Sequence, residues 1–196
     1  ITSAIEHESI LETAKDLERE GVEVIYLHVN QEGIIDLEEL KRSLNERTIL
    51  VSIICANNEI GTIQPIAEIS EIIRDFRNKK INDQRSMIVA AYPLFHTDAV
   101  QAFQFLDCDV NKLGVDLMTL SAHKIYGPKG IGALFIRNSK HEIRSTKQIQ
   151  NSKSQIQNVS DFGFRISDLQ QLISPIVVGG GQEFGLRAGT ENVASI

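Results

Sequence analysis

The stretch Thr48-Ile49-Leu50-Val51-Ser52-Ile53-Ile54-Cys55-Ala56 decides the fold. It is a run of apolar and β-branched residues, broken in polarity only by its central serine. Such a run is typical of a strand that is covered on both faces. A parallel sheet is the simplest host for a strand of this kind.

The residues before this run alternate between helix and strand patterns. Apolar residues recur at helical spacing over Ile10–Leu17, and Glu23–Leu27 has the composition of a strand. Asp36 and, three positions later, Glu39 form a capping box, which predicts a short helix through Leu44. The chain itself begins at Ile1 and is expected to enter the first helix directly.

The residues after the run continue the alternation. Pro65 is well placed as the first residue of a helix, and one apolar face extends from it to Phe76. Extended segments are expected at Met87–Ala91, Leu94–His96, Asp116–Ser121 and Ile131–Ile136. Strands that alternate with helices imply right-handed crossovers, so we expect an α/β fold with a mainly parallel sheet and flanking helices.

Composition is that of an ordinary globular protein with one sizeable core. The 196 residues are 42% hydrophobic and 23% charged, and the net charge is −6. An acidic chain is a poor partner for nucleic acids or anionic membranes, although a small anionic ligand needs only a local positive site. No apolar run approaches the roughly 18 residues of a membrane span, so we expect a cytoplasmic protein.

The segment 138–174 differs from the rest because it is polar and rich in Ser, Gln, Asn and Lys. We interpret it as a surface insertion between the core at 1–137 and its continuation at 175–196; a partner-binding loop is the alternative. Both ends of the chain fall inside regular patterns. We therefore expect an internal fragment of a larger protein.

Polar residues follow three of the expected strands, at the sheet edge where α/β proteins bind ligands. We expect these residues to converge on one pocket. Each also has a simpler interpretation: a lysine after a strand is usually solvated, an aspartate there caps a turn, and paired asparagines form a turn. The candidates are Asn57, Asn58, Asp98, Gln101, Ser121, His123 and Lys124.

Five motifs occur in an order that resembles the cysteine desulfurases, in the class V aminotransferase group of fold-type I pyridoxal phosphate enzymes. The resemblance covers nearly the whole chain outside 138–174. The motifs are Asn57-Asn58-Glu59-Ile60-Gly61-Thr62-Ile63-Gln64-Pro65, His96-Thr97-Asp98-Ala99-Val100-Gln101, Ser121-Ala122-His123-Lys124-Ile125-Tyr126-Gly127-Pro128-Lys129-Gly130, Gly179-Gly180-Gly181-Gln182-Glu183 and Leu186-Arg187-Ala188-Gly189-Thr190-Glu191-Asn192.

The resemblance assigns a role to each residue around the cofactor ring. Lys124 would hold pyridoxal phosphate as a Schiff base and shuttle protons, and Asp98 would pair with the pyridinium nitrogen. His7 would stack on the ring, although a histidine at a helix start is more often a surface or capping residue. Asn58 and Gln101 would face the phenolic oxygen.

The resemblance also assigns residues to the phosphate group of the cofactor. The resemblance places Ser121 and His123 at the phosphate. Thr190 would reach the phosphate of the partner subunit's cofactor, which implies a homodimer. The same resemblance implies L-cysteine as the substrate, with L-alanine and an enzyme persulfide as products.

The two cysteines of the chain do not match the family's persulfide cysteine. Cys55 lies in the apolar run and is most simply a core residue. Cys108 lies between Asp107 and Asp109, whose charges should raise its pKa. Neither forms a CxxC pair, a disulfide framework or a zinc site alone. We expect the nucleophilic cysteine beyond Ile196, and this chain alone to be inactive.

Three alternatives remain beside a desulfurase that supplies sulfur to an iron–sulfur scaffold or to thiolated tRNA. A selenocysteine lyase and another class V aminotransferase would share the fold. A non-catalytic paralogue that serves as a binding module is the alternative from a different class. The intact set of Lys124, Asp98 and His123 argues against the last of these.

Overall fold

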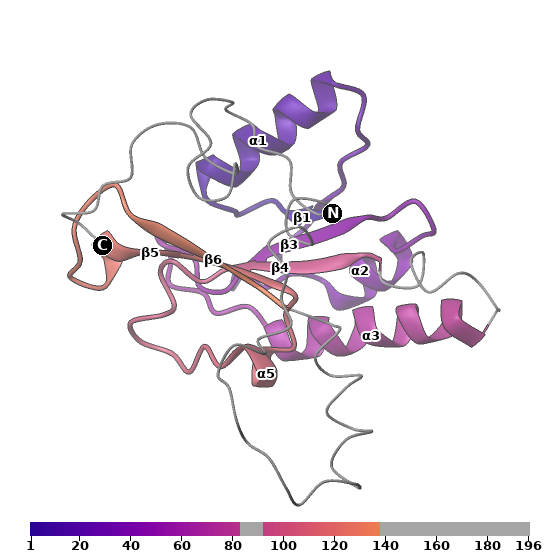
Figure 1. Cartoon of the computed structure of the whole chain (residues 1–196). Helices are drawn as coiled ribbons and strands as arrows, with labels where there is room; N and C mark the ends of the chain where they lie inside the picture. Colours follow the sequence, from indigo (N-terminus) through magenta and orange to yellow (C-terminus); the bar gives the residue numbers. More distant parts are fainter. Residues whose placement is uncertain (83–91, 138–196) are drawn as a thin grey trace, which may run out of the picture. The chain divides into compact units, whose positions relative to one another are not determined.

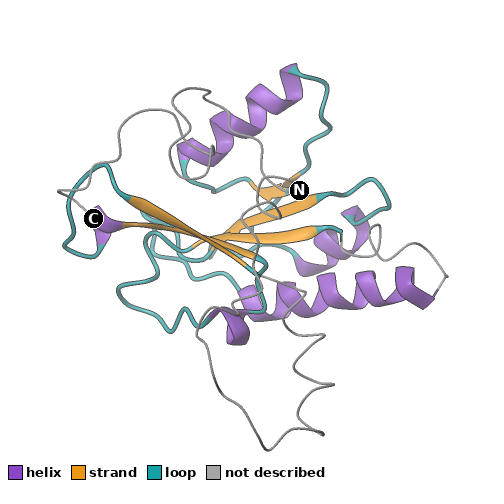
Figure 2. Ribbon diagram, viewed as in Figure 1, coloured by secondary structure: helices purple, strands orange, loops and turns teal. Residues whose placement is uncertain are grey.

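The computed structural model describes residues 1–82 and 92–137, which form a sheet with helices on both faces (Figure 2). The strand order is β2-β1-β3-β4-β5-β6. Neighbouring strands are parallel from β2 to β5, and β6 is antiparallel to β5. The strands are β1 (Thr2–Ser3), β2 (Tyr26–Leu27), β3 (Leu50–Ile54), β4 (Leu94–Asp98), β5 (Leu117–Ser121) and β6 (Gly132–Ile136).

The helices lie on opposite sides of this sheet. Figure 1 shows α1 on one side and α2, α3 and α5 on the other. A short 3-10 helix, η1, follows β5 directly. The helices are α1 (Glu8–Arg19), α2 (Leu37–Ser43), α3 (Ile66–Asn82), α5 (Val110–Leu113) and η1 (Ala122–Lys124).

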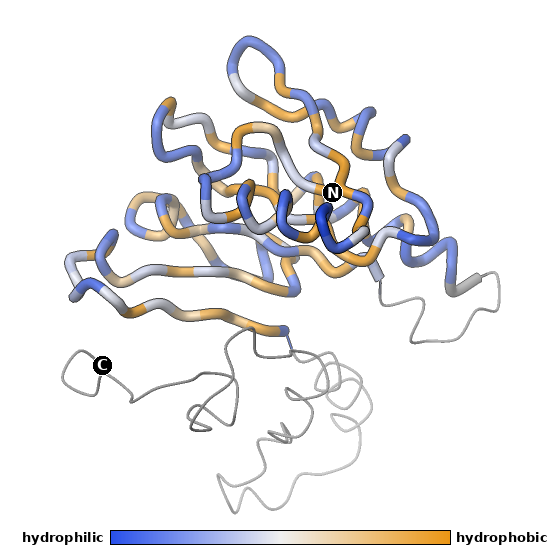
Figure 3. Tube along the Cα trace, turned by 90° about the horizontal axis from the view of Figure 1, so that it is seen from above, coloured by the Kyte–Doolittle hydropathy of each residue, from blue (hydrophilic) through white to orange (hydrophobic). Residues whose placement is uncertain are grey.

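The hydrophobic core lies between the sheet and the α2 and α3 helices. Leu40 of α2, Ile69 and Ile73 of α3, and Val51 and Phe95 of the sheet are all at most 1% exposed. Burial of each such side chain stabilises the fold by roughly 1.5–3 kcal/mol. Figure 3 shows the corresponding hydrophobic stretches along the strands.

The predicted α/β class and mainly parallel sheet are confirmed. β3 occupies the middle of the run that suggested a doubly covered strand, and Ile53 is completely buried. α3 begins directly after Pro65, whose carbonyl accepts the first-turn hydrogen bond from Ile69 N at 3.0 Å. Alternating strands and helices therefore predicted the architecture correctly.

Two details of the prediction were wrong. The chain does not enter α1 directly, because Thr2–Ser3 first pairs with both β2 and β3. Two residues are too few to show a strand period. The strand expected over Glu23–Leu27 is limited to Tyr26–Leu27. The direction of β6 was not predicted from the sequence: it runs antiparallel to β5, with Leu117 opposite Ile136 and Ser121 opposite Gly132.

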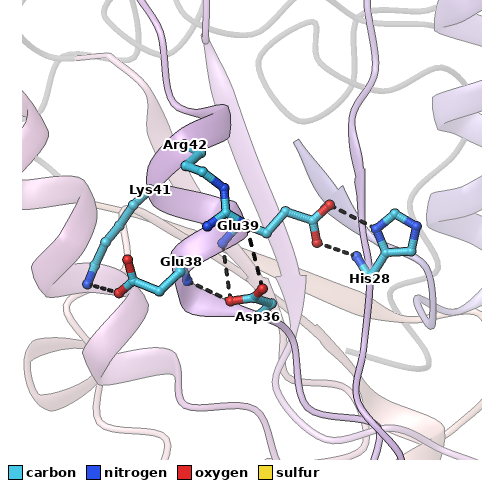
Figure 4. A network of polar contacts seen from close by, with 6 residues as sticks. All are labelled: His28, Asp36, Glu38, Glu39, Lys41 and Arg42. Atoms are coloured by element: carbon cyan, nitrogen blue, oxygen red, sulfur yellow. Dashed lines mark hydrogen bonds and ion pairs between the residues drawn. The ribbon is translucent and has the colours of Figure 1, made fainter.

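The predicted capping box at α2 is half formed. Asp36 caps the helix by accepting hydrogen bonds from the backbone N–H groups of Glu38 (2.8 Å) and Glu39 (3.2 Å). The Glu39 carboxylate instead accepts from His28 N at 2.9 Å and lies 2.8 Å from His28 Nδ1, as Figure 4 shows. The carboxylate thus joins α2 to the segment after β2 rather than closing the box.

A partly buried ion pair fixes α3 against the amino ends of β4 and β5. The Arg77 guanidinium donates to Asp116 and, through Nε, to the carbonyl of Pro93 at 2.9 Å. Asp116 also accepts from Phe95 N at 2.7 Å. These bonds all lie at the amino ends of the strands, so they do not occupy the polar side chains at the carboxyl ends.

The expected strand at Met87–Ala91, the polar segment 138–174, the continuation 175–196 and Thr190 lie outside the described residues. Ile1–Arg137 forms one compact unit. None of its helices, over residues 1–82 and 92–137, combines the length and apolar character needed to cross a bilayer.

Candidate functional site

The carboxyl ends of β3, β4 and β5 meet at one edge of the sheet. The register places Ile54 opposite Asp98, and Asp98 opposite Thr119. The polar residues that follow these strands therefore share this edge, as the sequence suggested. We call it the β3–β5 edge.

Asp98 is a nearly buried carboxylate at the end of β4, with 8% of its surface exposed. Its Oδ1 accepts a hydrogen bond from Val100 N at 2.9 Å, so it does cap the following turn. Its carbonyl accepts from Cys55 N at 2.8 Å, which fixes β4 against the end of β3. Nearby, Gln101 Oε1 is buried and has no hydrogen-bond partner among the described residues.

A histidine and a serine lie behind Asp98 on the same face of the sheet. Side chains alternate along a strand, so His96 shares the face of Asp98. Ser52 Oγ lies 2.8 Å from His96 Nδ1, and both side chains are buried. Burial lowers the pKa of His96 below its usual value, against the opposing effect of the Asp98 charge. The imidazole is therefore neutral at pH 7.

The Asn57-Asn58 pair forms the turn after β3. Asn57 is buried, and its Oδ1 accepts from the backbone of Glu59 (2.9 Å) and Ile60 (3.0 Å). Its Nδ2 donates to the carbonyl of Ile5 at 2.8 Å. Asn58 is exposed at the same turn. Asn57 therefore has the structural role, and the Asn58 amide is accessible to a ligand.

The segment after β5 presents a lysine in a constrained turn. Ser121 Oγ lies 2.6 Å from His123 Nδ1. Lys124 ends η1 and is exposed, and its ammonium has no hydrogen bond or ion pair within residues 1–82 and 92–137. Gly127 N donates to Ala122 O at 2.8 Å, and a Cβ on Gly127 would lie 2.8 Å from Ala122 Cβ. A glycine is thus required for the turn.

His7 caps the amino end of α1. Its Nδ1 accepts from Ser9 N at 3.2 Å and lies 2.9 Å from Ser9 Oγ. The ring is exposed, so the capping interpretation from the sequence is confirmed. Capping uses only Nδ1 and leaves the face of the ring available. The structure does not describe Thr190, the remaining predicted site residue.

Sequence reasoning missed Glu6, although it is one of the most unusual residues of the site. It is 5% exposed, and its Oε1 accepts from Ser3 Oγ (2.5 Å) and Ile54 N (2.8 Å). Burial raises the pKa of Glu6 to about 7, and the nearby Asp98 charge adds to this shift. A glutamate before a helix cap normally suggests a solvated residue, so no pattern pointed to its burial.

Both cysteines are buried thiols. Burial raises the pKa of Cys55 to about 12, and it also raises that of Cys108. The predicted direction for Cys108 is therefore correct, but burial is the main cause; a hydrogen bond with Cys55 acts against it, and the Asp107 charge adds a smaller rise. Asp109 instead caps α5 by accepting from Asn111 N at 2.8 Å. Neither thiol is a good nucleophile at neutral pH, because the thiolate is the reactive form.

A separate hollow of about 470 Å³ lies at the β2 edge and is lined by residues 28–30 and 34–37. Two of its polar side chains already have partners outside the hollow: His28 bonds Glu39, and Asp36 caps α2 (Figure 4). β2 lies at the far side of the sheet order from β4 and β5. We place the candidate site at the β3–β5 edge because the unpaired lysine, amide and buried carboxylate are there.

Comparisons with known proteins identify the family of the chain. The family model described as Aminotransferase class-V matches residues 1–196. Cysteine desulfurase IscS of Clostridium botulinum is 43% identical over the whole chain, which covers 38% of that relative. A mitosomal cysteine desulfurase of Trachipleistophora hominis is 42% identical over 97% of the chain, which covers 33% of that protein.

A solved structure described as "SspA in complex with cysteine" has the same fold. It superposes with a TM-score of 0.68 at 34% identity, over 99% of this chain and 43% of that one. The chain thus spans about two fifths of the length of the proteins it matches. The chain belongs to the aminotransferase class-V family.

Proposed function

We propose that the full-length protein containing this chain is a pyridoxal phosphate-dependent cysteine desulfurase, and that this chain supplies much of its cofactor site. The observation that carries the proposal is the register of β4 with β5, which brings buried Asp98 and the Lys124 segment to one sheet edge. The reaction would convert L-cysteine to L-alanine and leave the sulfur as an enzyme persulfide. The names of the relatives support this activity.

The side chains at the β3–β5 edge fit pyridoxal phosphate chemically. Asp98 is a buried carboxylate suited to a protonated pyridine nitrogen, and Lys124 is an unpaired amine suited to an aldehyde. The buried Gln101 Oε1 has no partner within the described ranges, and a buried polar atom left unpaired costs about 1–3 kcal/mol. A ligand at this position would satisfy it. When bound, the cofactor would supply an electron sink for the substrate.

Residues around the ring would orient the cofactor and move protons. Lys124 would take up and release the substrate proton, while His7 would cover one ring face. Asn58 would hydrogen-bond the phenolic oxygen together with Gln101. Neutral His96 behind Asp98 would add no second positive charge to compete with the pyridinium nitrogen for that carboxylate.

The remaining polar groups would bind the phosphate. We assign this role to Ser121 and His123, whose side chains already lie 2.6 Å apart (Ser121 Oγ to His123 Nδ1). Thr190 would contact the phosphate in the partner subunit of a homodimer. The sulfur acceptor would be a protein such as an iron–sulfur scaffold.

The persulfide cysteine would lie outside these 196 residues. Cys55 and Cys108 are both buried with raised pKa values, and they are the two cysteines of the chain. We propose the cytoplasm as the compartment. The mitosome is the alternative, from the name of the Trachipleistophora hominis relative, and cell fractionation distinguishes them.

Replacement of Lys124 in the full-length protein tests the proposal. Lys124→Ala should abolish the yellow cofactor absorbance and reduce alanine release from cysteine by about 10³-fold or more. Lys129→Ala, in the same exposed segment, is the matched control and should retain both. Unchanged absorbance and alanine release in Lys124→Ala would reject the catalytic interpretation.

The substrate used by the wild-type protein separates the alternatives. Release of alanine from selenocysteine but not cysteine would indicate a selenocysteine lyase. Amino-group transfer between an amino acid and a keto acid would indicate another class V aminotransferase. Cofactor-free wild-type protein with none of these activities would indicate the non-catalytic paralogue.

A further inference from the structure

The loop between β1 and α1 is fastened to the end of β3 at two points. Glu6 Oε1 accepts a hydrogen bond from Ile54 N at 2.8 Å, and the carbonyl of Ile5 accepts from Asn57 Nδ2 at 2.8 Å. Ser3 Oγ donates to the same Glu6 oxygen at 2.5 Å. The residue after Glu6 is His7. These bonds therefore fix the position of His7. They join its loop to the end of β3, the strand that pairs with β4, where Asp98 lies.

The second carboxyl oxygen of Glu6, Oε2, is buried without a hydrogen-bond partner in residues 1–82 and 92–137. An ionised carboxylate in this position would leave a buried negative charge half compensated, which is costly. The neutral acid avoids that cost, in agreement with the pKa of about 7.

The ionisable groups around Glu6 also favour its neutral form. Asp98, at the end of β4, is the charged group that disfavours a second negative charge here. The Asp98 charge also acts on His96 and on the Cys55 thiol, and burial keeps both neutral near pH 7. His7 on the same loop is exposed. No cation on these elements compensates an ionised Glu6.

We propose that Glu6 is a positioning residue of the cofactor site, whose carboxyl group clamps the loop carrying His7 to the end of β3 beside Asp98. In its neutral form the clamp leaves Asp98 as the negative charge that faces the cofactor nitrogen. The bonds from Ser3 and Ile54 favour the ionised form, but burial outweighs them, so above about pH 7 release of the ionised Glu6 to solvent opens the clamp. The positioning role toward the cofactor rests on the proposed function, whereas the clamp can be measured without cofactor.

Two substitutions of Glu6 separate its shape from its charge. Glu6→Ala removes the clamp, and Glu6→Gln keeps an acceptor oxygen for Ile54 N but stays neutral at every pH. Glu8→Gln, which removes an exposed charge two residues away, is the matched control. Circular dichroism checks that each full-length variant folds, and Glu6→Gln keeps the test informative if Glu6→Ala does not fold.

Hydrogen exchange of the Ile54 amide in the cofactor-free, full-length protein measures the clamp. After correction for the intrinsic exchange rate, Glu6→Ala should exchange about tenfold faster than wild type at about pH 6. Wild type should lose protection at about pH 8.5, and Glu6→Gln should retain it. Equal protection in Glu6→Ala and Glu8→Gln would overturn the clamp.

The dissociation constant of added pyridoxal phosphate measures the positioning role. Glu6→Ala should raise it about tenfold at about pH 6, and Glu6→Gln should stay within about twofold of wild type. If Glu6→Ala exchanges faster but its dissociation constant for pyridoxal phosphate is unchanged, the positioning role is overturned. Equal weakening of pyridoxal phosphate binding in Glu6→Gln and Glu6→Ala would also overturn it. Absence of binding by the wild type would instead reject the proposed function, and the exchange result would still decide the clamp.

Discussion

Ser52 Oγ lies 2.8 Å from His96 Nδ1, across the pair formed by β3 and β4, and both side chains are buried. This pair forms the layer behind Asp98. Removal of one partner leaves a buried polar group unpaired, so Ser52→Ala should lower the free energy of unfolding by about 1–3 kcal/mol. Urea denaturation of Ser52→Ala, His96→Ala and the double variant checks this. Strictly additive losses would contradict a direct bond.

The pH dependence of stability should show the buried Glu6. Its pKa is about 7 in the folded protein and near 4.5 when unfolded, so the folded state holds the proton more tightly. The resulting stabilisation is complete below about pH 4.5 and is lost as pH rises to about 7. Between about pH 5 and 8 the wild type should lose on the order of 2–3 kcal/mol relative to Glu6→Gln.

Urea denaturation of both proteins across this pH range makes the measurement. The comparison with Glu6→Gln cancels the opposite contribution of His96, whose lowered pKa reduces stability as pH falls below its unfolded value near 6.5. Parallel curves for wild type and Glu6→Gln would contradict a raised pKa for Glu6.

The turn after Lys124 should not tolerate a side chain at Gly127. Its Cβ would lie 2.8 Å from Ala122 Cβ and 3.0 Å from Ala122 O, so the backbone near the lysine must shift. We expect Gly127→Ala to cost about 1–3 kcal/mol and to weaken pyridoxal phosphate binding about tenfold. Denaturation and cofactor titration of the full-length protein measure the two effects.

Gly130→Ala is the control for this prediction. Gly130 has a positive φ of 85° but no atom within 4 Å of an added Cβ. It should cost about 1 kcal/mol through backbone strain and leave cofactor affinity unchanged. Equal loss of affinity in both glycine variants would show that Ala122 crowding is not the cause.

The two thiols should be structural. Because burial raises the pKa of Cys55 and Cys108, both should react with a thiol reagent at about pH 8 only after unfolding. Cys55→Ala and Cys108→Ala in the full-length protein should retain persulfide formation. Loss of the persulfide in either folded variant would place the sulfur nucleophile in this chain.

The sequence predicted those elements whose pattern is long enough to show a period. β3 and α3 were predicted because a nine-residue apolar run and a proline-led amphipathic segment each have one simple explanation. β1 was missed because it has two residues and is a strand only through its pairing with β2 and β3. The antiparallel direction of β6 depends on the length and path of the turn after Lys124, which hydrophobic pattern does not encode.

The candidate site was also predicted only in part. Residues that follow strand ends, such as Asp98 and Ser121, could be expected at one edge because parallel strands share it. The capping bonds of His7 were expected as the simpler interpretation. The clamp by Glu6 could not be predicted, because its partner, Ile54 N, is 48 residues away and lies in the backbone. The roles assigned to the site residues remain predictions.

Side chains alternate between the two faces of β4, so the two faces are under different constraints. Phe95 and Thr97 point to the packed side, and His96 and Asp98 point to the side of the site. Substitutions of Phe95 or Thr97 should change stability alone, whereas those of His96 or Asp98 should change both stability and the cofactor site. A single-residue insertion in this strand would exchange the two faces, so sequence drift here should proceed by replacement and not by length change.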